Sequence, residues 1–147
     1  MLASVKAGDD DYAGDVSTTE TWNQLVSDPN AHLVDVRTQP EWSFVGTPDL
    51  GKLGKRPVLV SWQMYPEMSV NPRFVDELRA QGIASGQPLY FICRSGARSR
   101  AAAKAMTAAG FGPCYNVAGG FEGDLDADKH RGRLGGWKAA GLSWIQS

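Results

Sequence analysis

The sequence has few cysteines, no long apolar run and no excess of charge of either sign. Two cysteines in 147 residues are too few for a disulfide-stapled scaffold. No apolar run approaches the roughly 20 residues that a membrane-spanning helix needs, and the first residues lack the apolar stretch of a secretory signal. Fifteen Lys and Arg balance sixteen Asp and Glu, which argues against binding to nucleic acid or to an anionic membrane. The composition therefore predicts a soluble, cytoplasmic protein.

Histidine is equally scarce, and no group of side chains has the spacing of a metal site. His32 and His130 lack partners at metal-ligand spacing, so we expect each of them to pack or to lie at the surface. Asp124–Asp128 imitates the start of a calcium loop, but Lys129 stands where such a loop needs glycine and Gly135 where it needs glutamate. We therefore expect a solvated loop here and no bound metal.

Apolar periodicity and turn residues divide the chain into alternating strands and helices. Residues 1–15 are polar and rich in Gly and Asp, which predicts a flexible lead-in before one domain over residues 16–147. Short apolar runs between turns predict strands buried on both faces, at 32–36, 57–62, 88–92 and 114–117. Capping residues and helical spacing predict helices over 17–28, 40–44, 71–82, 99–109 and 135–140. This alternation is typical of an α/β fold built around a parallel sheet.

The most informative segment is Phe91–Arg100, which reads Phe-Ile-Cys-Arg-Ser-Gly-Ala-Arg-Ser-Arg. Cys93 directly follows a predicted strand, and a tight loop that contains Gly96 leads from it into a helix. Ligand sites in open α/β sheets lie beyond the carboxyl ends of the strands. A loop that enters a helix presents backbone N–H groups and the positive end of the helix dipole, which favour a thiolate at its centre. Arg94 and Arg98 add positive charge and are able to grip an oxyanion through paired hydrogen bonds.

Two other interpretations of Cys93 are weaker. A buried core cysteine leaves unexplained why two arginines and a glycine share one turn. Cysteine phosphatases place five residues between the nucleophile and the arginine that holds the phosphoryl group, and Ser99 stands at that position here, with arginines only on either side of it. The residue before the cysteine is Ile92, where phosphatases and arsenate reductases of this architecture have histidine. The spacing therefore favours a smaller, sulfur-centred anion.

The segment Cys93-Arg94-Ser95-Gly96-Ala97-Arg98-Ser99 resembles the active-site loop of the rhodanese family of sulfurtransferases. Three further elements, one before this loop and two after it, stand in the same order as in that family. Leu33–Arg37 with Glu41-Trp42 resembles the family's Asp-x-Arg…Glu-aromatic signature. Tyr115–Phe121 resembles its hydrophobic-x-Gly-Gly element, and Gly136–Lys138 resembles its terminal Trp helix. The resemblance covers about residues 17–146. It implies a rhodanese-like α/β fold, with a central, mostly parallel sheet of four to five strands and helices on both faces.

The same resemblance implies the chemistry. A donor such as thiosulfate would pass its outer sulfur to the Cys93 thiolate, and a thiol, a sulfur-carrier protein or cyanide would accept that sulfur from the persulfide. The residues implied to bind the substrate are Arg94, Ser95, Gly96, Ala97, Arg98 and Ser99. The resemblance implies no metal and no organic cofactor, and it leaves the oligomeric state open. A non-catalytic rhodanese-like module for binding or redox sensing remains the alternative.

Two stretches depart from the family pattern and leave the acceptor open. Gly46–Asp49 replaces the Gly-His-Ile-x-Gly-Ala stretch that single-domain members commonly carry and continues into a longer loop, 46–55. The charged run Glu122–Arg133 separates the Gly-Gly element from the terminal Trp by more than is usual, and the role of the loop 122–135 is also open.

Several other polar and aromatic residues have a structural interpretation that is simpler than a catalytic one. We expect Asp35 and Arg37 to belong to the scaffold, with Asp35 accepting loop N–H bonds and Arg37 paired to Glu41 at helical i, i+4 spacing. Cys114 is expected in the core, because it begins a strand and lacks a nearby second cysteine. Trp62 and Tyr65 could wall the site, although core packing is the simpler expectation for both.

Overall fold

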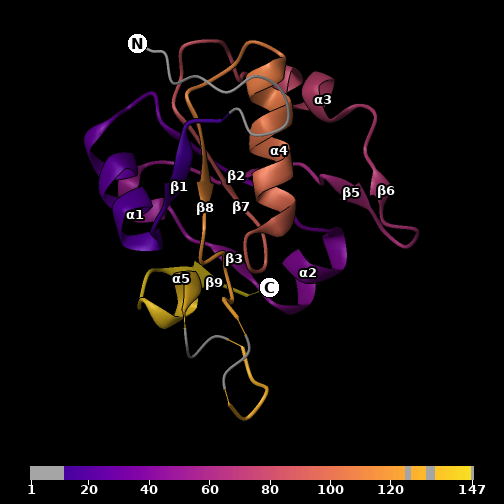
Figure 1. Ribbon diagram of the computed structural model, residues 1–147. Helices are drawn as coiled ribbons and strands as arrows, with labels where there is room; N and C mark the ends of the chain where they lie inside the picture. Colours follow the sequence, from indigo (N-terminus) through magenta and orange to yellow (C-terminus); the bar gives the residue numbers. More distant parts are fainter. Residues whose placement is uncertain (1–11, 125–126, 132–134, 147) are drawn as a thin grey trace.

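The computed structural model describes residues 12–124, 127–131 and 135–146, and its centre is a five-stranded sheet (Figure 1). The strand order is β1-β8-β7-β2-β4, and every neighbouring pair runs parallel. The strands are β1 (Gly14–Val16), β2 (His32–Asp35), β4 (Val58–Leu59), β7 (Leu89–Ile92) and β8 (Cys114–Val117). The expected α/β fold with a parallel sheet is confirmed.

Helices cover both faces of this sheet (Figure 1). They are α1 (Thr18–Ser27), α2 (Gln39–Phe44), α3 (Phe74–Ala80), α4 (Ala97–Ala108) and α5 (Gly136–Ala139). Ser17 begins α1 as expected, because its hydroxyl accepts a hydrogen bond from the Glu20 amide at 3.0 Å. Thr38 and Glu41 form a capping box that starts α2.

Alternation along the buried strands divides the core into two clusters. In β2, Leu33 packs with Leu25 of α1 and Trp137 of α5, whereas Val34 packs on the opposite face with Leu78 of α3 and residues of α4. Successive side chains of a strand point to opposite faces, so an apolar run buries both. The sheet is therefore a central layer between two helical layers, and its loops at the carboxyl edge are held from both sides.

Short pieces of regular structure lie where the sequence predicted loop, at 46–55, or predicted no regular element, at 63–70 and 144–145. The range 46–55, expected as loop, contains β3 (Thr47–Pro48), which pairs antiparallel with β9 (Trp144–Ile145), and the 3-10 turn η1 (Gly51–Leu53). A hairpin of β5 (Gln63–Met64) and β6 (Ser69–Val70) follows β4. Strands of two residues carry too little periodicity to be found from sequence.

The expectation of a flexible lead-in up to residue 15 is wrong at its end. Gly14–Val16 is the edge strand β1, in register with residues 115–117 of β8. The Ala13 amide also donates to the carbonyl of Cys114 at 2.8 Å. Residues 1–11 of the lead-in, and 125–126 and 132–134 of the loop 122–135, lie outside the described residues.

The described ranges contain no helix that combines the length and the apolar character needed to cross a bilayer. They also contain no group of three or more His, Cys, Asp and Glu side chains placed to hold a metal ion. His32 is half-buried and His130 exposed, as expected. Residues 125–126 of the calcium-like run Asp124–Asp128 are not among those described.

Candidate active site

Cys93 lies where β7 ends and α4 begins, with its sulfur facing the start of that helix. The residue is 1% exposed. Its Sγ accepts hydrogen bonds from the backbone amides of Gly96, at 3.2 Å, and Ser99, at 3.4 Å. The N-terminus of a 12-residue helix carries the positive end of its dipole, so the sulfur is surrounded by groups that favour negative charge.

Gly96 shapes this loop because no other residue fits its backbone. Its φ is +117°, a region that L side chains rarely adopt, and a Cβ built there would lie 2.6 Å from the carbonyl oxygen of Ala118. With Gly96 as N-cap, α4 begins at Ala97, two residues before the start predicted from sequence. Arg98 therefore belongs to the first turn of the helix instead of the loop, together with Ser99.

The Gly-Gly element after β8 holds the Cys93 loop in place through backbone hydrogen bonds. The amide of Phe121 donates to the carbonyl of Cys93 at 2.8 Å, and that of Glu122 donates to the carbonyl of Arg94 at 3.0 Å. Gly120, with φ +68°, packs so closely that an added Cβ would lie 2.5 Å from the Arg94 carbonyl oxygen. The family-like spacing of these glycines thus has a local cause, the close approach of two backbones.

A cavity of about 360 Å³ opens above Cys93. Its wall is formed by the Cys93 loop, α2 and the β5–β6 hairpin, through Glu41, Gln63, Met68, Cys93, Arg94, Ser95, Ala97 and Arg98. Sequence reasoning missed Gln63 and Met68, because neither belongs to a motif and the hairpin itself was not predicted. It assigned Glu41 to a different ion pair. A cysteine with open space above it and amides beside it is placed to act as a nucleophile.

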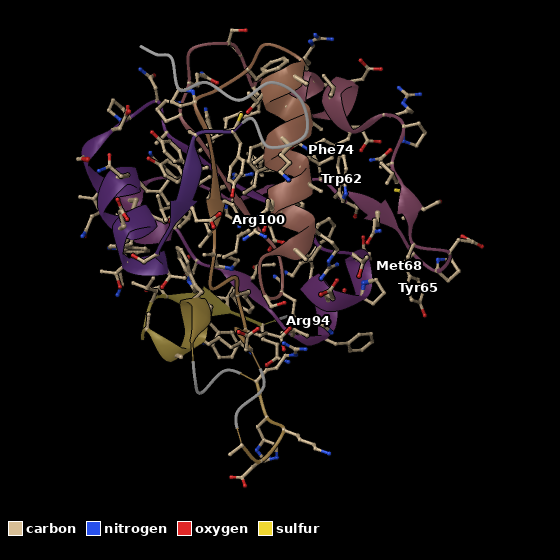
Figure 2. The ribbon with its side chains drawn as sticks, in the orientation of Figure 1. Trp62, Tyr65, Met68, Phe74, Arg94 and Arg100 are labelled. Carbon is tan, nitrogen blue, oxygen red and sulfur yellow. The ribbon has the colours of Figure 1, made fainter. Side chains whose placement is uncertain are left out.

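The two aromatic residues considered for the wall do not line this cavity. Trp62 packs edge-on against Phe74, with ring centroids 5.1 Å apart, which is core packing. Tyr65 is 64% exposed on the hairpin and does not line the cavity, whereas Met68, near it on the same hairpin, does (Figure 2).

Arg98 is held by Glu41 across the cavity wall. Its Nη1 lies 2.6 Å from Glu41 Oε1 and its Nη2 lies 2.9 Å from Oε2, so both ends of the fork are occupied. Burial opposes ionisation of Glu41, but the hydrogen bonds and charge of Arg98, with bonds from Thr38, outweigh it and lower the pKa of Glu41 to about 2. The same hydrogen bonds raise the pKa of Arg98. Both groups are therefore charged at neutral pH.

Arg37 does not pair with Glu41, and the expected i, i+4 ion pair is wrong. α2 begins at Gln39, so Arg37 precedes the helix and the helical spacing does not apply. Arg37 instead binds Asp35, with Nε 2.9 Å from Oδ1 and Nη2 2.7 Å from Oδ2. Both side chains are fully buried, and Arg37 also lies 4.3 Å over the Phe121 ring. This pair is scaffold, as predicted.

Arg94 differs from Arg98 because it is exposed at the rim of the cavity (Figure 2). Within the described part of the chain its guanidinium has no ion-pair or hydrogen-bond partner. Of the two arginines predicted to bind substrate, Arg94 is thus open to an anion and Arg98 is engaged.

Ser99 connects the sulfur to a buried polar chain that reaches the surface. Its hydroxyl lies 3.2 Å from Cys93 Sγ and 2.5 Å from Asn116 Oδ1, and its single proton serves one of them at a time. Asn116 Nδ2 donates to Asp15 at 3.0 Å, which turns Oδ1 toward Ser99. Asp15 also pairs with the exposed Arg100 at 3.3 Å. Sequence reasoning missed Asn116, because its partners are 17 and 101 residues away.

Comparison with known families identifies the family to which the chain belongs. A family model described as the STR4 middle domain matches residues 13–147. The chain belongs to the STR4 middle domain family. This STR4 middle domain chain is 37% identical over 129 residues to an uncharacterized protein, RC0915, of Rickettsia conorii, with 88% of this chain and 94% of that protein covered. It is 25% identical over 131 residues to rhodanese-like domain-containing protein 4, chloroplastic, of Arabidopsis thaliana, of which it spans 25%.

Solved structures support the same fold. Rv0390 from M. tuberculosis is 47% identical, with a TM-score of 0.85 and coverage of 93% of this chain and 100% of that one. A polysulfide-sulfur transferase homodimer from Wolinella succinogenes is 22% identical, with a TM-score of 0.61 over 90% and 78% of the two chains. A rhodanese-like domain protein from Staphylococcus aureus is 20% identical, with a TM-score of 0.58 over 91% and 98%. At these identities the last two show the fold alone, which is rhodanese-like.

Proposed function

We propose that this STR4 middle domain protein is a sulfurtransferase that carries a sulfane sulfur as a persulfide on Cys93. The observation that carries the proposal is the sulfur's position: at the floor of an open cavity and within hydrogen-bond distance of two amides at a helix N-terminus. This setting favours a thiolate, which is the nucleophilic form of cysteine. The rhodanese-like fold of the structural neighbours is consistent with this chemistry.

The reaction proceeds in two half-reactions that need no outside oxidant or reductant. With thiosulfate, the Cys93 thiolate attacks the outer sulfur, the donor's S–S bond breaks, and sulfite leaves with the bonding electron pair. Cys93 is then a persulfide whose terminal sulfur carries the negative charge. A thiolate, a sulfur-carrier protein or cyanide attacks that terminal sulfur and releases the Cys93 thiolate. No metal or organic cofactor takes part in either step.

The loop around Cys93 offers donors for the added sulfur. The amides of Arg94, Ser95, Ala97 and Arg98 donate to no protein acceptor among the described residues, and all four residues line the cavity. We assign these amides, with those of Gly96 and Ser99, to the terminal sulfur anion, as an oxyanion hole stabilises a developing oxygen charge. Arg94 at the rim attracts the anionic donor.

Thiosulfate-to-cyanide transfer by the wild-type protein and by Cys93→Ser tests the proposal. The expected loss in Cys93→Ser is complete, because a serine hydroxyl at neutral pH neither attacks nor holds a sulfane sulfur. Cys114→Ser is the matched control and is expected to retain activity. Equal activity in wild type and Cys93→Ser, with thiosulfate and with an organic persulfide alike as the donor, would refute the proposal.

Two further measurements separate the alternatives. Turnover of a phosphate ester would support a phosphatase, although Ser99 occupies the position of its arginine. Absence of any sulfur on Cys93, with the protein folded, would favour a binding or redox-sensing module. The two free cysteines suit the reducing cytoplasm, where we place the reaction.

A further inference from the structure

The ion pair between Glu41 and Arg98 sets the charge of the cavity. The side chains are only 20% and 17% exposed, so solvent screens them poorly. Glu41 holds both ends of the Arg98 fork and stays ionised well below neutral pH. An anion that enters the cavity therefore meets a carboxylate together with the guanidinium, and the attraction of Arg98 is largely cancelled.

The rest of the lining adds little positive charge. Gln63 and Met68 on the hairpin wall and Ala97 at the start of α4 are uncharged. Arg94 is the remaining cation of the lining and lies exposed at the rim, where solvent weakens its field. With Arg94 and Arg98 opposed by Glu41 and by the proposed Cys93 thiolate, the lining carries no net charge.

The dianion thiosulfate fits this cavity poorly. It carries two negative charges, whereas the charge of Arg98 is already balanced by Glu41, which also accepts from both Nη atoms of its guanidinium. A donor whose sulfane sulfur is carried by a carbon chain needs only one charge for that sulfur. Met68 and Ala97 offer apolar surface to such a chain.

We infer that Glu41 is a specificity-determining residue, which selects an organic persulfide over thiosulfate as the sulfur donor. This inference rests on the proposed persulfide chemistry of Cys93. In the transfer, the Cys93 thiolate attacks the terminal sulfur of R–S–SH, the donor's S–S bond breaks, and R–S⁻ leaves with the electron pair. The products are Cys93–S–SH and the thiolate, so atoms, charge and oxidation states balance.

The test compares kcat/KM for two donors, thiosulfate and cysteine persulfide, whose ammonium and carboxylate cancel. In wild type we expect cysteine persulfide to be the better donor. Glu41→Gln keeps an Oε1 acceptor for Thr38 but removes the charge, and its amide NH₂ cannot accept the second bond from Arg98. We expect the ratio of kcat/KM for thiosulfate to that for cysteine persulfide to rise about tenfold, because one unit of repulsion is removed near the dianion.

Salt and a remote variant provide the controls. The gain of Glu41→Gln toward thiosulfate should shrink as the ionic strength rises, which a merely structural effect would not do. Glu20→Gln makes the same chemical change on α1, away from the cavity, and should leave the ratio as in wild type.

A second variant keeps the test decisive if Glu41→Gln folds poorly. Gln63→Glu adds a negative charge to the opposite wall and should lower the same ratio about tenfold. A ratio that neither variant moves would overturn the inference while Cys93 still accepts sulfur from both donors. If neither donor places sulfur on Cys93 in the wild type, the proposed function itself fails.

Discussion

Cys93 and Cys114 are both cysteines, are equally buried and lie next to the end of a strand, but the groups around their sulfur atoms differ. Each is 1% exposed. Cys93 follows β7 at the carboxyl edge of the sheet, whereas Cys114 begins β8 and pairs in register with Leu89 at the amino edge. Four residues of strand separate the two edges by roughly 13 Å. Burial alone therefore does not decide which cysteine is chemically useful.

What differs is the set of groups around each sulfur. Cys93 Sγ accepts bonds from two amides and lies beside open space. Cys114 is buried among apolar side chains of the core, and desolvation raises the pKa of its thiol to about 11. A parallel α/β sheet concentrates helix N-termini at its carboxyl edge, and this edge is where a thiolate is stabilised. Four experiments test this difference between the surroundings of the two cysteines.

The largest contrast is expected in alkylation by iodoacetamide at pH 7.5. Cys114 is almost entirely protonated there and has little access to the reagent, so we expect Cys93 to react at least about a thousandfold faster. Peptide mapping after timed quenching gives both rates. In denaturant the two rates should become similar, which controls for sequence effects. Comparable rates for the two cysteines in the folded protein would contradict the claim that only Cys93 lies in surroundings that favour reaction.

Gly96→Ala should destabilise the fold by about 3 kcal/mol, from the left-handed backbone and the clash with the Ala118 carbonyl. Gly86→Ala is the matched control, since Gly86 also has positive φ, at +84°, but nothing lies within 4 Å of an added Cβ. It should cost only about 1 kcal/mol. Urea unfolding measures the stability of both variants. Equal losses would show that the close contact of Gly96 with Ala118, in the Gly-Gly element, does not shape the Cys93 loop.

Acid should weaken the fold through Glu41. Its pKa is about 2 in the folded protein against an ordinary value of 4.5, so between these values the unfolded chain binds more protons. The contribution is fully present above pH 4.5 and is lost as the pH falls toward 2. Allowing for partial exposure, this loss is about 2 kcal/mol. Roughly half of it, about 1 kcal/mol, is lost between pH 6 and pH 3, so wild type should lose that much more than Glu41→Gln over this range, and parallel losses would contradict the ion pair.

Cys114→Ala should have the smallest effect. A small cavity in the core is expected to cost about 1 kcal/mol in unfolding free energy, and sulfur transfer should stay within about twofold of wild type. Thermal unfolding and the transfer assay measure the two quantities. A large loss of transfer without loss of stability would mean that Cys114 takes part in the reaction.

The elements that sequence identified are those with local signals. The strand before Cys93, the helix after it and the glycines at 119–120 were found from apolar runs, capping residues and motif spacing, and the structure gives each a local cause. Ser17 likewise begins α1 through a bond to a residue three positions away. Such signals lie within a few residues and are readable in a single sequence.

The features that sequence missed depend on distant partners. Arg98 and Glu41 are 57 residues apart, and the i, i+4 spacing assigned Glu41 to Arg37 although Arg37 lies before the helix. The strand β1 exists because its backbone pairs with β8, about 100 residues later, against a polar composition that favoured a loose segment. The role of Asn116 could not be predicted, because only the folded sheet brings it next to Ser99.

The mass of the Cys93 peptide after treatment with a sulfane-sulfur donor decides whether Cys93 carries a persulfide. One added sulfur atom, about 32 Da, is expected on Cys93, removable by cyanide or a thiol, while the Cys114 peptide keeps its original mass. An unmodified Cys93 in folded protein, or sulfur found on Cys114 instead, would contradict the account.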